Sequence, residues 1–239
     1  MKTKQILVLG SNFGGATAAL ELQRKLKGLA KVTVLSPNPN FTFIPSMIWV
    51  PFGRRKLSDI SFPIRPLMEK KGIQFIQDNA LQVNPEKNEV VTEKNGTLAY
   101  DYLIVSTGIQ MDFNVVENLH PENGMIENIV IPKYGERAYK RFQELKQNPG
   151  PVVVGATQGA SCMGAAYEYL FNMDKELRRQ KIRDKVDLVW FTPEPYLGHF
   201  GIGGITGGQS MLEAFMKMYN IKWYTNASVA KIEKEQITL

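Results

Sequence analysis

The chain has 239 residues, of which 44% are apolar and 22% are charged, and its net charge is +6 at pH 7. These values are typical of a globular protein with a core that needs no cross-links. The single cysteine, Cys162, excludes an intrachain disulfide, and the histidines His120 and His199 show no metal-ligand spacing. The diffuse positive charge suits an anionic ligand or a membrane surface better than nucleic acid. We therefore expect neither a metal nor a nucleic-acid partner.

The first 36 residues predict a strand, a glycine turn, a helix and a second strand. Residues 6–9 form a continuous apolar run, as in a strand buried on both faces, and 16–27 carries apolar residues at helical spacing. The second strand, 32–35, ends at Ser36, which completes a βαβ unit. Because the run at 6–9 is too short for a signal peptide or a membrane span, we expect a cytoplasmic or peripheral membrane protein.

The turn reads Gly10-Ser11-Asn12-Phe13-Gly14-Gly15, with Asn12 in place of the middle glycine of G-x-G-x-x-G. The first glycine allows a tight turn, the last lets the helix pack close to the sheet, and the helix N-terminus offers donors to phosphate. Ser36 stands where an acid usually binds ribose, which weakens any claim for NAD at this turn. In this context the motif predicts a dinucleotide site.

A mixed region follows the first unit. We expect an irregular stretch rich in proline and aromatic residues over 37–55, and a solvated basic face at Arg54, Arg55 and Lys56 that contacts phosphate or membrane. Beyond it, the pattern predicts a helix over 63–71 and strands over 72–76, 80–92 and 97–105, the last two around the Asn95-Gly96 turn.

The opening pattern recurs about 145 residues later. It predicts, in order, a strand over 152–154, a turn from Gly155 to Gly159, a helix over 160–179, a strand over 186–191, a helix over 211–219 and strands over 222–225 and 228–232. The last strand looks like one half of an unfinished hairpin. The predicted fold is therefore α/β, with two Rossmann-like βαβ dinucleotide-binding lobes that are incomplete at the C-terminus. We expect an FAD-type domain over 1–112, a connecting segment over 113–150 and an NAD-type domain over 151–239.

Four segments resemble the sulfide:quinone oxidoreductase branch of the two-dinucleotide flavoproteins, which have a glutathione-reductase-like fold. Ser106-Thr107-Gly108 resembles the segment that returns the chain to FAD, and Phe43-Ile44-Pro45-Ser46 resembles the loop beside the flavin ring. The stretch 148–169 resembles the redox-cysteine helix, most specifically at Gly159-Ala160-Ser161-Cys162-Met163-Gly164. Glu194-Pro195-Tyr196-Leu197-Gly198-His199 is also similar, and the similarity continues in register over essentially the whole chain.

This resemblance implies an FAD-dependent pyridine nucleotide-disulfide oxidoreductase that oxidises sulfide to zero-valent sulfur and passes electrons through flavin to a quinone. Cys162 matches the cysteine nearest the flavin, at a helix start that favours a thiolate, and His199 matches a histidine that assists sulfide or proton handling. A small buried thiol is the structural alternative for Cys162. A membrane surface is an implied partner, and a homo-oligomer stays open. The implied FAD contacts are Gly10, Asn12, Phe13, Gly14, Gly15, Ser36, Pro45, Ser46, Thr107, Gly108 and Gly159.

Two positions depart from this family pattern. The first redox cysteine of the family falls on Val130, which cannot carry sulfur, and a nearby family histidine falls on Tyr134. The family's third cysteine, second FAD segment and quinone-facing helices would lie beyond residue 239. We therefore expect either the N-terminal portion of a longer flavoprotein or a naturally short relative, with weakened affinity for FAD.

Two other functions stay open. In type II NADH dehydrogenases the second turn would bind NAD(P)H, and Glu194 would supply an acid for its ribose. Alternatively, the chain is a non-catalytic FAD-binding or partner-binding module, with the aromatic run 41–52 as an interaction surface in place of a flavin-side loop. Residual NADH:flavin reductase activity would favour the first function. Bound flavin without sulfide-dependent quinone reduction would favour the second.

Overall fold

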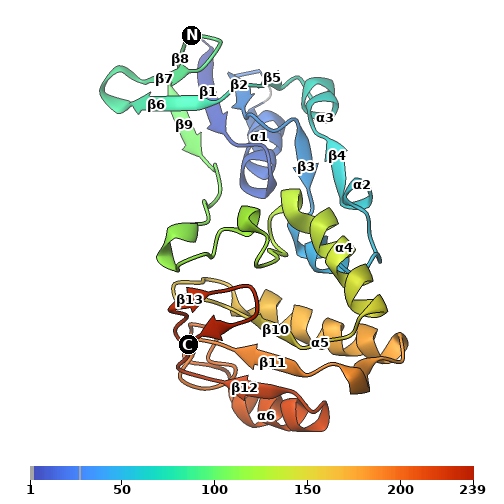
Figure 1. The fold of residues 1–239 in the computed structure, drawn as a ribbon. Helices are drawn as coiled ribbons and strands as arrows, with labels where there is room; N and C mark the ends of the chain where they lie inside the picture. The colour runs from blue at the N-terminus through green and yellow to red at the C-terminus, as the bar shows by residue number, and fades with distance from the viewer. Residues whose placement is uncertain (1–2, 27) are drawn as a thin grey trace. The chain divides into compact units, whose positions relative to one another are not determined.

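The computed structural model describes residues 3–26 and 28–239, and the chain packs into two compact units (Figure 1). Unit 1 comprises Met1–Phe43 and Ser58–Met111, and unit 2 comprises Ile44–Leu57 and Asp112–Leu239. Both the predicted connecting segment and the stretch Ile44–Leu57 therefore pack in unit 2. The domain limits at 112 and 150 stay a prediction.

Unit 1 is built on a parallel sheet with the strand order β5-β2-β1-β9 (Figure 1). The sheet and its helices consist of β1 (Lys4–Leu9), α1 (Phe13–Leu26), β2 (Ala30–Leu35), α3 (Arg65–Lys70), β5 (Gln74–Ile76) and β9 (Tyr102–Val105). Two antiparallel sheets complete the unit, one of β3 (Asn40–Thr42) and β4 (Ser61–Pro63), the other of β6 (Ala80–Asn84), β7 (Glu89–Thr92) and β8 (Thr97–Ala99), with η2 (Pro85–Lys87) between β6 and β7. The short helix α2 (Leu57–Ile60) crosses the division between the units.

The parallel sheet of unit 1 is covered on both faces, which explains the continuous apolar run of its central strand. Val8 belongs to the same core cluster as Ala19 of α1. Leu7 and Leu9, whose side chains alternate to the other face, cluster with Val90 of β7. Both faces of the strand that leads into the first glycine turn are thus buried in the core of unit 1.

Unit 2 is built on a second parallel sheet, with the strand order β10-β11-β12. Its strands and helices are η1 (Ile44–Trp49), η3 (Phe113–Val115), η4 (Pro121–Asn123), α4 (Pro132–Gln147), β10 (Val152–Gly155), α5 (Met163–Arg179), η5 (Arg183–Lys185), β11 (Leu188–Phe191), α6 (Gly208–Met218), β12 (Lys222–Tyr224), β13 (Lys231–Ile232) and β14 (Ile237–Thr238). Trp190 of β11 and Leu170 of α5 are fully buried in its core, together with Met216 of α6.

Four expectations about elements were wrong. The stretch 37–55, which was expected to be irregular, contains β3 and η1. The connecting segment, for which no helix or strand was predicted, contains the 16-residue helix α4, which begins at Pro132 and buries Tyr134, Ala138 and Phe142 at a spacing of four residues. The hairpin at the end of the chain is closed, because β13 pairs antiparallel with β14. The helix α5 begins at Met163, three residues later than predicted.

Other boundaries shift by a few residues. The helix predicted over 63–71 begins at Arg65, because Ser61–Pro63 pairs with β3 instead. The last residue of the helix predicted over 16–27 lies outside the described residues. Within 3–26 and 28–239, no helix combines the length and the apolar character that a membrane crossing needs.

Candidate functional site

The first turn joins β1 to α1 through three residues, Gly10 to Asn12. Gly10 has a φ of +97°, and a Cβ there would lie 2.3 Å from the backbone oxygen of Ser106. A Cβ on Gly15 would lie 1.9 Å from the carbonyl oxygen of Gly10. Both distances are shorter than real side chains allow, so positions 10 and 15 accept glycine alone.

Ser106 brings the end of β9 against this turn. Its backbone nitrogen and its Oγ both donate to the carbonyl oxygen of Leu9, at 2.9 and 2.7 Å. Thr107 and Gly108 follow and are exposed. Because β2 and β9 flank β1 on opposite sides, the strand order reverses here, which is where open α/β sheets bind ligands. The structure therefore brings the predicted glycine turn and the predicted 106–108 segment together.

Asn12 stands directly before α1. Its backbone carbonyl accepts the first helical hydrogen bond, from the Ala16 nitrogen at 2.8 Å. Its side-chain Oδ1 is buried and, in the described part of the chain, has no hydrogen-bond partner. A ribose hydroxyl is a donor that would satisfy this oxygen, while the free N–H groups of the first helical turn suit phosphate. The residues present at this turn thus fit a dinucleotide.

Ser36 follows the end of β2 and is buried. Its Oγ lies 2.9 Å from the Oγ of Ser11 and 3.2 Å from the carbonyl oxygen of Asn38. The hydroxyl therefore ties the glycine turn to the loop after β2. Its contact with ribose stays a prediction.

The second turn joins β10 to α5 through seven residues, Ala156 to Cys162. Gln158 holds this turn, because its Nε2 donates to the Val229 carbonyl at 2.9 Å and its Oε1 accepts from the Val229 nitrogen at 3.0 Å. Gly159 has a φ of +79°, but a Cβ there would meet no heavy atom within 4 Å. Gly159 is therefore favoured by its backbone conformation rather than by a close approach.

Cys162 stands directly before α5 and is exposed. The alternative of a small buried thiol is therefore wrong. Its backbone is non-helical, with φ −133° and ψ 87°, and its side chain forms no capping hydrogen bond. The thiol lies at the positive end of a 17-residue helix, a place that favours an anion.

Glu194, the acid expected to be free for a ribose, is buried and fully engaged within unit 2. Its Oε2 accepts from the Tyr167 hydroxyl and from Thr192 Oγ1, both at 2.8 Å, and its Oε1 accepts from the Phe200 nitrogen at 2.6 Å. Burial raises the pKa of Tyr167 above its ordinary value, so that its hydroxyl remains a donor. These bonds contradict the expectation that Glu194 is available to a ribose.

His199 lies in the loop after β11 and is half-buried. Its Nδ1 accepts from the Gly201 nitrogen at 3.2 Å, and its ring meets the Tyr196 ring edge-on at 5.2 Å. Over the described ranges no hydrogen bond links His199 to Cys162. Its role in handling sulfide or protons stays a prediction.

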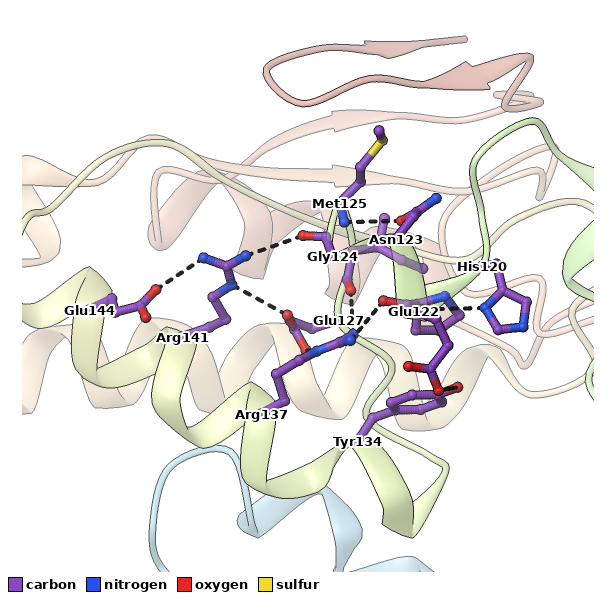
Figure 2. Close-up of polar contacts among 12 residues, drawn as sticks. His120, Glu122, Asn123, Gly124, Met125, Glu127, Tyr134, Arg137, Arg141 and Glu144 are labelled. Carbon is purple, nitrogen blue, oxygen red and sulfur yellow. Dashed lines mark hydrogen bonds and ion pairs between the residues drawn. The ribbon is translucent and has the colours of Figure 1, made fainter.

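The two departures from the family pattern lie just before and within α4. Val130 is half-buried, and its backbone nitrogen donates to Asn128 Oδ1 at 2.9 Å. Tyr134 is buried, and its hydroxyl donates to Glu122 Oε1 at 3.1 Å (Figure 2). Burial first, and then the hydrogen bond to Glu122, raise the pKa of Tyr134 above its ordinary value. The phenol therefore cannot act as the base that a histidine would be at this place.

Two arginines of α4, which sequence analysis missed, hold this segment in place. Arg137 donates to Glu127 at 2.8 Å and to two backbone carbonyls at 2.7 and 2.8 Å, and Arg141 donates to the Gly124 carbonyl at 3.2 Å (Figure 2). Their spacing of four residues places both side chains on one face of the helix. That spacing is the feature of the sequence from which their shared role could have been predicted.

The segment predicted to lie beside the flavin divides between the units, since Phe43 belongs to unit 1 and Ile44 to Ser46 belong to η1 of unit 2, where Pro45 is exposed and Ser46 is half-buried. Val50 and Phe52 are buried, so an interaction surface over the whole run 41–52 is wrong. The solvated basic face is also wrong for Arg54, which forms an ion pair with a buried glutamate of α5.

A profile of the pyridine nucleotide-disulphide oxidoreductase family matches residues 4–239. The chain belongs to this family. The α/β fold with parallel sheets predicted from the sequence is confirmed. Members of the family are FAD-binding flavoproteins, which confirms the predicted cofactor at the level of the family.

Known members of the family extend further than this chain. It is 38% identical to the sulfide-quinone reductase of Aquifex aeolicus over 237 residues, which are 98% of the chain and 53% of the reductase. The crystal structure of the Aquifex aeolicus sulfide:quinone oxidoreductase superimposes with a TM-score of 0.91 at 37% identity, and covers 98% of this chain and 53% of that one. The chain thus spans about half the length of this relative.

A Plasmodium falciparum NDH2 solved with NADH shares the fold alone. Its TM-score is 0.73 at 18% identity, and the match covers 99% of this chain and 50% of that one. The greater similarity to the Aquifex reductase favours the sulfide:quinone reading over the NADH dehydrogenase reading.

Proposed function

We propose that this chain forms the FAD-binding and thiol-bearing part of a sulfide:quinone oxidoreductase. The observation that carries the proposal is an exposed thiol, Cys162, at the start of a long helix in a chain 38% identical to a sulfide-quinone reductase. In this proposal sulfide is oxidised to zero-valent sulfur, quinone receives the electrons, and the protein meets a membrane surface to reach the quinone.

Unit 1 supplies the dinucleotide site. Gly10 to Gly15 hold the pyrophosphate, Asn12 and Ser36 contact the adenosine side, and Thr107 and Gly108 close the site from β9. The close approaches at Gly10 and Gly15 and the orphaned Asn12 Oδ1 support this assignment. When bound, FAD supplies the two-electron acceptor that passes electrons from sulfide to quinone.

Unit 2 supplies the sulfur site. One HS⁻ joins the Cys162 thiolate to give a persulfide, and this step releases one proton and two electrons, which the quinone takes up through the flavin. The family resemblance assigns Pro45, Ser46 and Gly159 to flavin contacts and His199 to the handling of the proton in this proposal. Val130 cannot take over the sulfur, so a second thiol would have to come from outside residues 1–239.

The structure speaks against a pyridine-nucleotide site at the second turn. The acid that would bind the ribose, Glu194, already accepts three hydrogen bonds within the protein. Seven residues separate β10 from α5, compared with three between β1 and α1, so the N–H donors of α5 lie further along the chain from the end of the strand. NADH is therefore a control substrate in the test below.

The test is an anaerobic titration of the FAD-loaded protein with sulfide, followed by the visible absorbance of the flavin. We expect sulfide to bleach the flavin band and decylubiquinone to restore it. Cys162→Ser should slow bleaching at least about a thousandfold, as loss of a catalytic nucleophile does, without lowering the amount of bound flavin. Ser161→Ala, an exposed neighbour in the same turn, is the matched control and should bleach normally. Bleaching by NADH but not by sulfide would overturn the proposal.

A further inference from the structure

The segment Ile44–Leu57, called the strap segment below, leaves one unit and packs in the other. It lies between β3 and β4, which pair with each other in unit 1, yet its own residues belong to unit 2. Val50 is buried against α4, since a Cβ on Gly135 would lie 3.0 Å from Val50 Cγ1. Phe52 stacks on the ring of Tyr169 in α5, with 5.1 Å between the ring centroids. The strap segment is therefore a built part of unit 2.

An ion pair between Arg54 and Glu176 fixes the end of the strap segment to α5. Only 1% of the Glu176 side chain is exposed, compared with 32% for Arg54. A carboxylate so deeply buried is costly unless it is paired. Arg179, one helical turn away, is the second partner at 2.9 Å, but 60% of its side chain is exposed and it belongs to the same helix. Arg54 thus joins Glu176 of α5 to the strap segment.

The guanidinium of Arg54 also lies over the ring of Trp49, 5.8 Å from its centroid, so the same side chain braces the strap segment internally. The predicted flavin-side residues Pro45 and Ser46 stand at the start of the strap segment. Cys162 stands directly before the helix to which Arg54 is tied. The strap segment and Cys162 are thus both attached to α5, and attachment to a shared element is how a reactive constellation keeps its geometry.

We propose that Arg54 is a positioning residue, whose ion pair with Glu176 holds Pro45 and Ser46 of η1 at a fixed place relative to the Cys162 thiol. The catalytic meaning of this placement rests on the proposed function, in which Pro45 and Ser46 contact the flavin and the thiol takes the sulfur. The placement itself is a property of unit 2 and can be measured without flavin.

The first arm of the test measures the distance between two spin labels by pulsed electron resonance. One label is on Cys162, the sole native cysteine, and the other is on a cysteine introduced by Ser46→Cys. We expect a narrow distance distribution in the parent and one about twice as broad with Arg54→Met, because the tether is lost. Arg179→Met is the matched control, since it removes the other positively charged partner of the Glu176 carboxylate and leaves the strap segment unchanged. Arg54→Lys should narrow the distribution again in part.

If Arg54→Met and Arg179→Met broadened the distance distribution equally, the charge balance at Glu176, and not the Arg54 tether, would determine the distance. That result would overturn the proposal. An unchanged distribution with Arg54→Met would also overturn it. Circular dichroism checks that each variant is folded.

The second arm compares FAD-loaded variants by flavin spectrum and by sulfide kinetics. Arg54→Met should shift the flavin band and lower kcat about tenfold with little change in KM for sulfide, whereas Arg179→Met should change neither. A normal spectrum and kcat despite a broadened distance distribution would refute the positioning role. Protein that binds no FAD would instead refute the proposed function, while the first arm would still decide whether the tether exists.

Discussion

The two strand–turn–helix units of this chain share a plan and differ in the length of the turn. In unit 1, three residues separate β1 from α1, whereas in unit 2 seven residues separate β10 from α5. The short turn brings the helix N-terminus, with its free N–H groups, directly after the glycine. The long turn instead delivers the Cys162 thiol to the helix start. Turn length therefore decides how far along the chain the helix start lies from the end of the strand.

The glycines of the two turns share one feature and differ in another. In unit 1, Cβ atoms on Gly10 and Gly15 would overlap the backbone. In unit 2, a Cβ on Gly155, at the end of β10, would lie 2.5 Å from the backbone oxygen of Phe191, whereas a Cβ on Gly159 would meet no heavy atom within 4 Å. Both turns therefore begin at a glycine with a close backbone approach, and the second turn is also held by the Gln158 side chain on Val229.

The largest effect is expected from breaking the first turn. Gly15→Ala places a methyl group 1.9 Å from the Gly10 carbonyl oxygen, so it should destabilise unit 1 by about 3 kcal/mol or more and abolish FAD binding. Gly14→Ala is the matched control for stability, because its Cβ would lie 3.3 Å from the Ser106 Cβ and not against the backbone, and it should destabilise unit 1 far less. Urea unfolding and flavin absorbance measure the two effects. An equal loss of stability in both variants would mean that the amino-acid composition of the helix, and not the close approach at Gly15, determines the stability of this turn.

A smaller effect is expected from Glu194→Gln in unit 2. The amide keeps one acceptor oxygen, but its NH₂ group then faces a donor that the carboxylate had satisfied, so stability should fall by about 1–3 kcal/mol. Thermal unfolding checks this, with the exposed Glu168→Gln as control. Unchanged stability together with a raised KM for NADH would restore Glu194 as a ribose ligand and remove the difference between the two units.

These results show where sequence analysis succeeds and where it stops. The order strand, glycine turn, helix, strand was readable in both units because burial on both faces of a parallel sheet leaves a continuous apolar run. The close approach of Ser106 to the glycine turn was not readable, since only the fold brings residues so far apart in sequence together. The prediction that residues 106–108 contact FAD came from the family resemblance and not from any expected contact with the glycine turn.

The errors have physical causes of the same kind. Glu194 reads as a free acid in sequence, because nothing local announces that Tyr167 and Phe200 will donate to it. Arg54 reads as a solvated charge, because its buried partner Glu176 lies 122 positions away. The start of α5 was placed too early, since Ala160 and Ser161 do not break a helix pattern and the hold on the turn comes from Val229.

The pH dependence of stability at Asp78 tests the edge of unit 1 that carries the predicted dinucleotide site. Burial alone would raise the pKa of this carboxyl, but hydrogen bonds from Asn95, from the Lys94 backbone and from Asn79 outweigh it and hold the pKa far below its ordinary value. A depressed pKa in the folded state stabilises the protein above the ordinary carboxyl pKa of about 3.9, and this contribution is lost as the pH falls below it.

Asp78→Asn should therefore lower the stability of unit 1 at pH 7, and the difference from the parent should shrink as the pH falls below 4. Because the Asp78 nitrogen also donates to the Ser36 carbonyl at 3.2 Å, FAD affinity should fall with the stability. Urea titrations across this pH range measure it, with the exposed Glu69→Gln as a variant expected to follow the parent throughout. A difference that is constant with pH would show that the carboxylate charge does not hold this edge.

The smallest change in stability is expected at Asn12. An asparagine that caps a helix is usually worth about 1 kcal/mol through its side-chain oxygen, but here that oxygen makes no bond within the described residues. Asn12→Ala should then leave the free energy of unfolding of the FAD-free protein nearly unchanged, while the Kd for FAD rises about threefold to tenfold, as loss of one hydrogen bond to the ligand does. Urea unfolding and a flavin titration separate the two quantities. A loss of stability without a change in the Kd for FAD would show that the Asn12 side chain stabilises α1 and does not bind FAD. Binding at the short turn would then rest on backbone N–H donors alone.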